Sequence, residues 1–233
     1  MTTDFTSDPP DVPRPSANAP EVVVQRLPLY VRVLAQFDAA GSEMVSSEQL
    51  GAQLQMTPAQ IRKDLSYFGR FGKQGRGYNV KRLAIELRSI LGLDHQWNAA
   101  LVGVGRLGRA IIAYPGFRPA GFHVVAAFDA DPSVIGSAVG DITVRPIDQI
   151  KKTVDELGIR IGIVAVPAAN AQSVFDALVE AGIKAILNYA PIAPQVPVDV
   201  KVRGVDPVLA LQSMTYFLKP DATSDQGDSA ADR

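Results

Sequence analysis

A glycine-rich stretch in the middle of the chain could bind the pyrophosphate of a dinucleotide. The run Leu101-Val102 is followed by Gly103-Val104-Gly105-Arg106-Leu107-Gly108, which has the spacing G-x-G-x-x-G. In this pattern the first glycine permits a tight turn, the second lets a pyrophosphate approach the backbone, and the third lets the following helix pack closely. The amides of Arg106 and Leu107 would lie at the helix start, where the helix dipole favours phosphate. All six residues, Gly103 to Gly108, are therefore candidate cofactor ligands.

A carboxylate follows this loop at the distance expected for a ribose ligand. Asp129 ends an apolar run that begins at Val124, and it stands 21 residues after Gly108. A carboxylate at this place accepts hydrogen bonds from the ribose hydroxyls of NAD(H). Because Ala130 follows it in place of a basic residue, NAD(H) is favoured over NADP(H). Two alternatives stay open: glycines that serve only a turn, and a different nucleotide or coenzyme A on the same fold.

A second group of side chains is suited to contact DNA. Thr57-Pro58 supplies an N-cap and a proline at the first position of a helix that runs to about Phe68. On a helical wheel Ile61 and Leu65 share a core face with Phe68. The opposite half carries Ala59, Gln60, Arg62, Lys63, Ser66 and Tyr67. Cations, amides and hydroxyls are the groups that contact base edges and phosphates.

The neighbouring residues complete a winged helix-turn-helix pattern. Ser46-Ser47-Glu48-Gln49 offers an N-cap for a short helix that ends near Leu54. Glycines and basic residues between Phe71 and Val80 indicate a hairpin, the wing. Asp64 would repel phosphate, so we expect it to be structural and paired with a neighbouring arginine. The candidate DNA contacts are Ser47, Thr57, Gln60, Arg62, Lys63, Ser66, Tyr67, Lys73, Arg76, Gly77 and Tyr78. A solvated face on an ordinary core helix is the alternative.

The distribution of charge agrees with a nucleic-acid contact. The chain carries 23 basic and 24 acidic residues and has a net charge of −1. Between Gln60 and Arg88, however, eight basic residues stand against two acidic ones. A basic segment within a neutral chain is the electrostatic footprint of a DNA-binding surface. The chain has no cysteine, which excludes disulfides, thiolate zinc sites and thiol catalysis.

Hydrophobic periodicity predicts an α/β protein with two domains. Residues 21–92 form the winged helix-turn-helix domain. In residues 93–206 short apolar runs alternate with helical segments, which predicts a Rossmann-like doubly wound parallel sheet. Residues 207–219 form a helix so apolar that we expect it to pack on a partner subunit. We expect residues 1–20 to be a disordered leader and residues 220–233 a disordered acidic tail. No apolar run is long enough to span a bilayer, and we expect a cytoplasmic protein.

These motifs resemble those of the Rex family of redox-sensing transcriptional repressors. The resemblance covers about residues 21–219, in order, and is carried by Arg62–Gly69, Gly75–Tyr78, Gly103–Gly108, Tyr114–Phe117 and Ala181–Pro191. It implies a homodimer with an N-terminal winged helix, a C-terminal Rossmann domain and a last helix exchanged between subunits. Such proteins bind palindromic operator DNA with NAD+ or with an empty ligand site, and release it when NADH binds. They control bacterial genes of fermentation and respiration.

The resemblance also implies roles for single residues around the cofactor. It assigns Gly103–Gly108 to the pyrophosphate and Asp129 to the adenine-side ribose. It places Pro167 near the cofactor, and Tyr114 matches a tyrosine that responds to the redox state. The residues expected near the nicotinamide include Asn188, Ala190 and Pro191.

Two further positions match residues that tie the DNA-binding domain to the cofactor domain, namely Arg32 and Asp206. Pro207 departs from the family pattern, because many relatives carry a bulky apolar residue after the aspartate. The resemblance therefore leaves open how this chain senses the nicotinamide at that position. The proline-rich leader is also outside the family pattern.

Three classes of function remain open on the residues themselves. An NADH-responsive repressor is favoured, with no catalytic residue and no metal. An NAD-dependent dehydrogenase with an accessory winged-helix domain needs a proton donor beside the nicotinamide. Tyr114 and His123 are the only remote candidates, and neither has an evident orienting partner. The third class is a coenzyme-A or nucleotide-binding module that acts through protein contacts.

Overall fold

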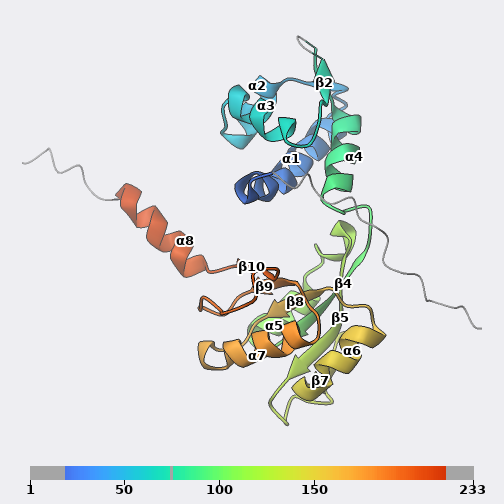
Figure 1. The fold of residues 1–233 in the computed structure, drawn as a ribbon, viewed down its shortest axis with the longest axis vertical. Helices are drawn as coiled ribbons and strands as arrows, with labels where there is room; N and C mark the ends of the chain where they lie inside the picture. The colour runs from blue at the N-terminus through green and yellow to red at the C-terminus, as the bar shows by residue number, and fades with distance from the viewer. Residues whose placement is uncertain (1–18, 74–75, 219–233) are drawn as a thin grey trace, which may run out of the picture. The chain divides into compact units, whose positions relative to one another are not determined.

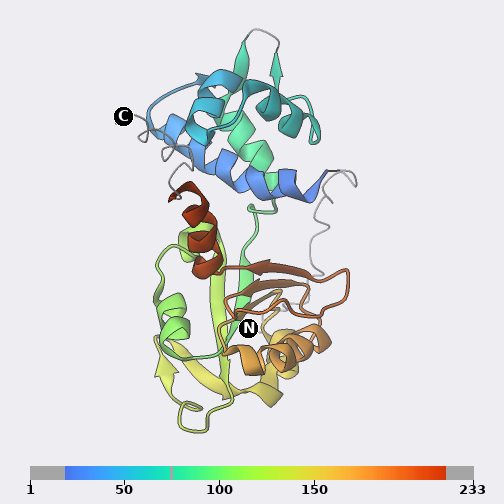
Figure 2. The ribbon, with the colours of Figure 1, turned by 90° about the vertical axis from the view of Figure 1, so that its left-hand side faces the viewer.

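The computed structural model describes residues 19–73 and 76–218. The acidic tail at 220–233, and the leader except for its last two residues, lie outside the described residues. The chain divides into two compact units, residues 1–96 and residues 97–233. Figures 1 and 2 show the elements of each unit from two sides.

The first unit is a winged helix-turn-helix fold (Figure 1). Its strands pair antiparallel in the order β1-β3-β2, so β2 and β3 form the predicted hairpin and β1 adds a third strand to it. Its elements, in chain order, are α1 (Glu21–Ala39), β1 (Met44–Val45), α2 (Ser47–Leu54), α3 (Pro58–Ser66), β2 (Gly72–Lys73), β3 (Gly77–Asn79) and α4 (Val80–Ile90).

The predicted capping residues begin α2 and α3. The Ser46 hydroxyl accepts the Gln49 backbone N–H while the Gln49 side chain accepts that of Ser46, a complete capping box. Thr57 Oγ1 accepts the Gln60 backbone N–H and starts α3. The core is formed by apolar side chains of all four helices and β1, among them Leu27, Leu34, Val45, Leu50, Ile61, Leu65, Leu83 and Leu87.

The second unit contains a seven-stranded sheet in the order β10-β9-β8-β4-β5-β7-β6. Every neighbouring pair is parallel except β6 and β7, which are antiparallel. This confirms the doubly wound fold predicted from the alternation of apolar runs and helical segments. The strands are β4 (Trp97–Val102), β5 (Phe122–Asp129), β6 (Ala138–Val139), β7 (Ile142–Pro146), β8 (Ile161–Val164), β9 (Ala185–Asn188) and β10 (Lys201–Gly204).

Helices cover both faces of this sheet. On one face Val102 and Phe128 belong to a core that includes residues of α6 (Ile150–Glu156) and α7 (Ala168–Glu180). On the other face Leu101 packs in a separate cluster with Ile111 of α5 (Arg106–Ala113). Two short 3-10 helices, η1 (Arg118–Ala120) and η2 (Ile147–Gln149), complete the connections. The middle strands are thus buried from both sides, which is why their sequences are almost continuously apolar.

The last described segment consists of α8 (Pro207–Met214) and the 3-10 helix η3 (Thr215–Leu218). In Figure 1 it projects away from the sheet of its own unit. Every residue from Pro207 to Leu218 is exposed, although most of them are apolar. An apolar helix that its own unit leaves uncovered agrees with the expectation of a partner surface.

Candidate cofactor site and DNA-binding surface

The glycine loop lies where the strand order reverses. From β4 the chain passes to β5 and β7 on one side of the sheet, and later to β8, β9 and β10 on the other. Ligands of open α/β sheets bind outside the carboxyl ends of the strands at such a point. The loops after β4 and β8 meet there, because a Cβ on Gly103 would lie 2.5 Å from the Ala165 carbonyl oxygen.

The three glycines of the loop are required for different reasons. Gly103 has a φ of +98°, which disfavours other residues, and a Cβ on Gly108 would collide with the carbonyl oxygen of Gly103. Gly105 has an ordinary φ of −71°, and apart from its two chain neighbours no described residue comes within 4 Å of the place its Cβ would take. The described chain itself therefore gives no reason for glycine at 105. Close approach of a ligand to the backbone would supply such a reason.

Asp129 connects the loop to the end of β5. Its Oδ2 accepts the backbone N–H of Val104 at 2.7 Å, and its Oδ1 accepts that of Asp131 at 3.0 Å. Each carboxylate oxygen has capacity for a second hydrogen bond. The half-buried side chain can therefore hold the loop and accept ribose hydroxyls at the same time. This arrangement fits the adenosine half of NAD(H).

Two helices begin at this edge of the sheet without a side-chain cap. Gly105 precedes α5 and Pro167 precedes α7, and neither supplies a side-chain acceptor. The first backbone N–H groups of a helix have no partner within it and favour an anion. Arg106 and Leu107, in the first turn of α5, are exposed. The phosphates of a dinucleotide fit these donors.

The loop after β9 is held by its own asparagine. The buried Asn188 accepts the Ala190 N–H at 2.9 Å through Oδ1, and its Nδ2 donates to the carbonyls of Ala190 and Ile192 at 3.0 and 3.2 Å. Ala190 is buried and Pro191 is exposed. The Asn188 amide thus stabilises the loop through hydrogen bonds within it. That Asn188 lies near a nicotinamide stays a prediction, which depends on the position of this loop at the carboxyl end of β9.

The two remote proton-donor candidates lie away from the glycine loop of their own chain. Tyr114 follows the last residue of α5, about 12 Å along the helix from its start. Its ring packs over Gly116 and edge-on to Phe117, with centroids 5.1 Å apart. His123 stands at the start of β5, about 20 Å along the strand from Asp129. Neither arrangement supplies the acid expected beside a nicotinamide in a dehydrogenase.

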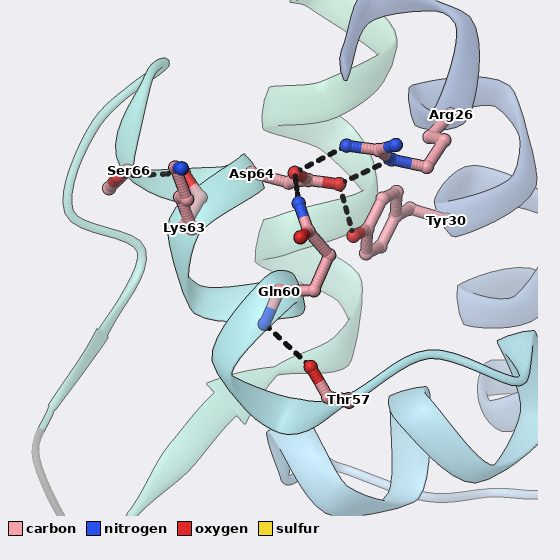
Figure 3. Close-up of polar contacts among 7 residues, drawn as sticks. All are labelled: Arg26, Tyr30, Thr57, Gln60, Lys63, Asp64 and Ser66. Atoms are coloured by element: carbon pink, nitrogen blue, oxygen red, sulfur yellow. Dashed lines mark hydrogen bonds and ion pairs between the residues drawn. The ribbon is translucent and has the colours of Figure 1, made fainter. Parts of the chain in front are cut away.

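In the first unit α3 presents a polar face to solvent. Arg62, Lys63 and Ser66 are exposed, and Tyr67 is half-buried at the helix end. The Ser66 hydroxyl donates to the backbone carbonyl of Lys63 at 2.7 Å (Figure 3). These residues are where the sequence predicts DNA contacts.

Arg62 is attached to the start of α2. Its Nη1 donates to the Ser47 hydroxyl at 2.8 Å and lies 3.7 Å from Glu48 Oε1. Hydrogen bonds from its own backbone N–H and from Ser46 hold the pKa of Glu48 below its usual value. In the absence of DNA, Arg62 therefore has an anionic neighbour, which a DNA phosphate would have to replace.

A hollow of about 770 Å³ separates α3 from the wing. The backbone of β3 packs tightly on β1, since a Cβ on Gly77 would lie 2.5 Å from the Val45 carbonyl oxygen. Tyr78 is half-buried, and burial raises the pKa of its hydroxyl. Lys73 ends β2, and nothing further is described of its side chain. The polar residues that line the hollow include Ser46, Ser47, Arg62, Ser66, Arg70 and Arg76.

Asp64 is structural, as predicted, but its partner comes from another helix. The fully buried carboxylate is paired with Arg26 of α1 at 2.7 Å, and it also binds Tyr30 and Gln60 (Figure 3). Sequence reasoning missed Arg26 and Tyr30, although their spacing of four places both on one face of a predicted helix. The amide of Gln60, a predicted DNA contact, donates to Asp64 Oδ1 at 2.6 Å.

The two residues expected to connect the domains lie in different units. Arg32 is exposed on α1. Asp206 accepts the Val208 backbone N–H at 2.8 Å and caps α8. Their role in connecting the two domains stays a prediction.

Replacing Glu48 with glutamine should strengthen binding to random-sequence DNA by up to about five-fold at low salt, the range of an exposed ion pair. The change removes the negative charge that is paired with Arg62 and that would repel an approaching DNA phosphate. Fluorescence anisotropy with a labelled random duplex measures it. Glu21→Gln, an equal charge change at the start of α1, is the control. An equal gain in both variants would assign the effect to net charge.

Comparison with known proteins places the chain in a family. Residues 18–66 match the model described as a putative DNA-binding protein N-terminus, and residues 94–192 match the CoA binding domain model. The redox-sensing transcriptional repressor Rex of Chloroflexus aurantiacus is 54% identical over 85% of this chain and 94% of its own length. The Rex protein of a Roseiflexus species is 51% identical over 90% of this chain and 96% of its own. The chain belongs to the Rex family.

Solved structures agree with this assignment. The structure of RSP, a Rex-family repressor, in complex with β-NAD+ and operator DNA has a TM-score of 0.81 and 39% identity. It covers 85% of this chain and 92% of that one. RSP in complex with β-NADH has a TM-score of 0.78 and 37% identity, over 86% and 94% of the two chains. The predicted family and the predicted combination of a winged helix with a Rossmann fold are confirmed.

In residues 19–73 and 76–218, no group of three or more histidine or acidic side chains is arranged to hold a metal ion. Among the helices in that part of the chain, none has the length and apolarity needed to cross a membrane.

Proposed function

We propose that this Rex-family chain represses transcription by binding operator DNA as a homodimer, and that NADH releases it. The observation that carries this is the pairing of a basic, exposed α3 face with a glycine loop whose Gly105 is open to a ligand. The relative RSP, solved with β-NAD+ and operator DNA and also with β-NADH, supports both ligands.

On the DNA side, the proposed base and phosphate contacts come from the exposed face of α3 and from the wing. Arg62, Lys63 and Ser66 reach the major groove, because a recognition helix presents such side chains to base edges. Ser47 and Thr57 lie at the starts of α2 and α3, where backbone N–H groups and hydroxyls hold phosphates. Arg76 and the residues after it bring the wing to the adjacent backbone.

On the cofactor side, the proposed ligands are the Gly103–Gly108 loop, Asp129, the start of α7 at Pro167 and the loop after β9. The loop and the two helix starts offer backbone donors to the pyrophosphate. When the cofactor is bound, its nicotinamide ring would be the part that differs between NAD+ and NADH. Tyr114 lies far from the loop of its own chain, so a response of this tyrosine to the redox state calls for a second subunit.

The exposed apolar segment α8–η3 is proposed to form the dimer interface. Leu209, Leu211, Met214 and Phe217 are all more than half exposed in the single chain. A contiguous apolar surface of this kind marks a protein contact. A two-fold dimer would place two α3 helices on half-sites about one helical turn of DNA apart.

Release follows if NADH binds one dimer arrangement more tightly than the other. A difference of about 5.5 kcal/mol would move the equilibrium from 1:99 to 99:1. A change in the spacing of the two reading helices is enough, because the half-site spacing is fixed. Arg32 on α1 and Asp206 before α8 are the residues we propose to carry this change between the units.

We further propose that the chain is not an enzyme and acts in the cytoplasm, on DNA. Hydride transfer needs an acid or base beside the nicotinamide. Tyr114 and His123 both lie away from the carboxyl edge of the sheet in their own chain. Incubation with NADH and a panel of small carbonyl compounds should give no turnover above the rate without protein.

The test of the proposed function is operator binding at one fixed salt concentration, because affinities driven by phosphate contacts change steeply with salt. A duplex selected by this chain from a random pool serves as the probe. We expect tight binding with NAD+ or with no nucleotide, and release by NADH. Equal affinity with NAD+ and NADH would defeat the proposal.

A further inference from the structure

A buried ionic cluster joins α3 to α1 within the first unit (Figure 3). Asp64 has no exposed surface and accepts four hydrogen bonds. Arg26 Nε and Nη2 donate to its two oxygens at 2.7 Å each, in the bidentate geometry of a guanidinium and a carboxylate. The Tyr30 hydroxyl donates at 2.9 Å and Gln60 Nε2 at 2.6 Å.

The cluster is fully satisfied. Burial alone would raise the pKa of Asp64, but hydrogen bonds from Arg26, Gln60 and Tyr30 outweigh burial and lower it below the usual value. Burial and the hydrogen bond to Asp64 raise the pKa of the Tyr30 hydroxyl, which therefore stays protonated as a donor. In the part of the chain that the structure describes, no buried side-chain nitrogen or oxygen lacks a partner.

Stability does not by itself account for such a cluster. Replacing a buried ion pair by apolar groups of similar volume is often neutral or stabilising. The ionic cluster adds a defined orientation, since two parallel hydrogen bonds from a guanidinium fix the orientation of the carboxylate. Because Asp64 lies in the last turn of α3 and Gln60 in the first, this fixes the rotation of α3 about its axis. The same rotation decides where Arg62 and Lys63 point.

The cluster also includes Gln60, which the helical wheel places on the predicted DNA-binding face. Gln60 lies in the first turn of α3, the part of a recognition helix that contacts base edges. Its amide nitrogen is committed to Asp64, four residues further along. The exposed positions beside it are Arg62, Lys63 and Ser66; Arg62 donates to the Ser47 hydroxyl and Ser66 to the Lys63 carbonyl.

We propose that Gln60, Asp64, Arg26 and Tyr30 are positioning residues that hold α3 in its DNA-reading orientation on α1, and that Gln60 does not read a base. The proposal rests on the proposed DNA binding, but it does not depend on NADH. It assigns base selectivity to the exposed residues of α3 and makes α1 the support from which they are presented.

The first experiment separates positioning from base reading. Gln60→Ala and the matched Lys63→Ala variant are titrated with the selected operator and with duplexes that each carry one changed base pair. We expect Gln60→Ala to weaken all duplexes by a common factor of roughly three- to ten-fold, the net value of one ordinary hydrogen bond, with the order of base preference unchanged. A loss of preference at one base pair alone would overturn the proposal, because it would show that Gln60 reads that pair.

The second experiment separates positioning from folding. A variant with Arg26→Met, Tyr30→Phe, Gln60→Leu and Asp64→Leu replaces the cluster by apolar groups, and circular dichroism and thermal unfolding establish that it is folded. We expect operator affinity to fall at least ten-fold while NADH affinity in the second unit is unchanged. A folded variant that binds the operator as tightly as the natural chain would overturn the proposal.

Should the apolar variant not fold, Tyr30→Phe and Asp64→Asn decide instead. Uniform weakening across the duplex panel, at temperatures where both variants are folded, would support positioning. Unchanged operator affinity in both would overturn it. Failure of the proposed function would be detected separately, because NADH would then not change operator binding by the natural chain. In that case the duplexes with single changed base pairs still test the role of Gln60.

Discussion

Replacing Gly105 with alanine is expected to weaken NADH binding by about 100-fold, or about 2.7 kcal/mol, without destabilising the fold. Backbone angles of −71° and −163° suit alanine, and apart from the two chain neighbours no described residue comes within 4 Å of the new methyl group. The change should even stabilise the folded state by about 0.4–1 kcal/mol, because it restricts the unfolded chain. The loss of affinity arises because the methyl group occupies the path by which a pyrophosphate approaches the backbone.

Titration by NADH fluorescence, together with thermal unfolding, measures both effects. Gly108→Ala is the matched control within the same loop. Its Cβ would collide with the Gly103 carbonyl oxygen, so this variant should lose stability as well as affinity. If Gly105→Ala bound NADH as tightly as the natural chain, the pyrophosphate would have to lie elsewhere.

The second large effect is expected on α8. Leu209→Asp combined with Leu211→Asp should convert the dimer into a monomer and lower operator affinity by about 10³-fold. Two linked reading helices gain about 10²- to 10⁴-fold from the effective concentration of the second one, and the monomer loses this gain. Both leucines are more than 60% exposed in the single chain, so the aspartates should not disturb the unit to which α8 belongs.

Sedimentation velocity and operator titration, each at one salt concentration, test this prediction. Gln212→Asp, a charge placed at an exposed polar position of the same helix, should leave the dimer intact. Affinity for a duplex with a single half-site should be similar for the double variant and the natural chain. A double variant that remained a dimer would show that α8 is not the interface.

Much of the fold and part of the site could be predicted from the sequence, because short-range spacing determines them. Thr57-Pro58 and Ser46 to Gln49 mark helix starts through contacts within four residues. The glycine loop and Asp129 follow from one strand-loop-helix unit and the strand after it. The two-residue strands β1 and β6 were not predicted, because two residues are too few to show an alternation of apolar and polar positions.

The contacts that were not predicted join residues far apart in the chain or depend on side-chain direction. Arg26 and Asp64 are separated by 38 positions, and only the packing of α1 on α3 brings them together. Gln60 lies on the outer half of the wheel by its Cα position, but its long side chain turns back to Asp64. Trp97 and Asn98 begin β4, although a polar asparagine beside the apolar run obscures the start of this strand in the sequence.

The central claim is that NADH and operator DNA oppose each other through one equilibrium, and reciprocity tests it most directly. Thermodynamic linkage requires that operator weaken NADH binding by the same factor by which NADH weakens operator binding. NADH affinity should therefore be measured with and without saturating operator, at one salt concentration. We predict a loss of NADH affinity equal to the loss of operator affinity caused by NADH. An NADH affinity that saturating operator leaves unchanged would contradict the account.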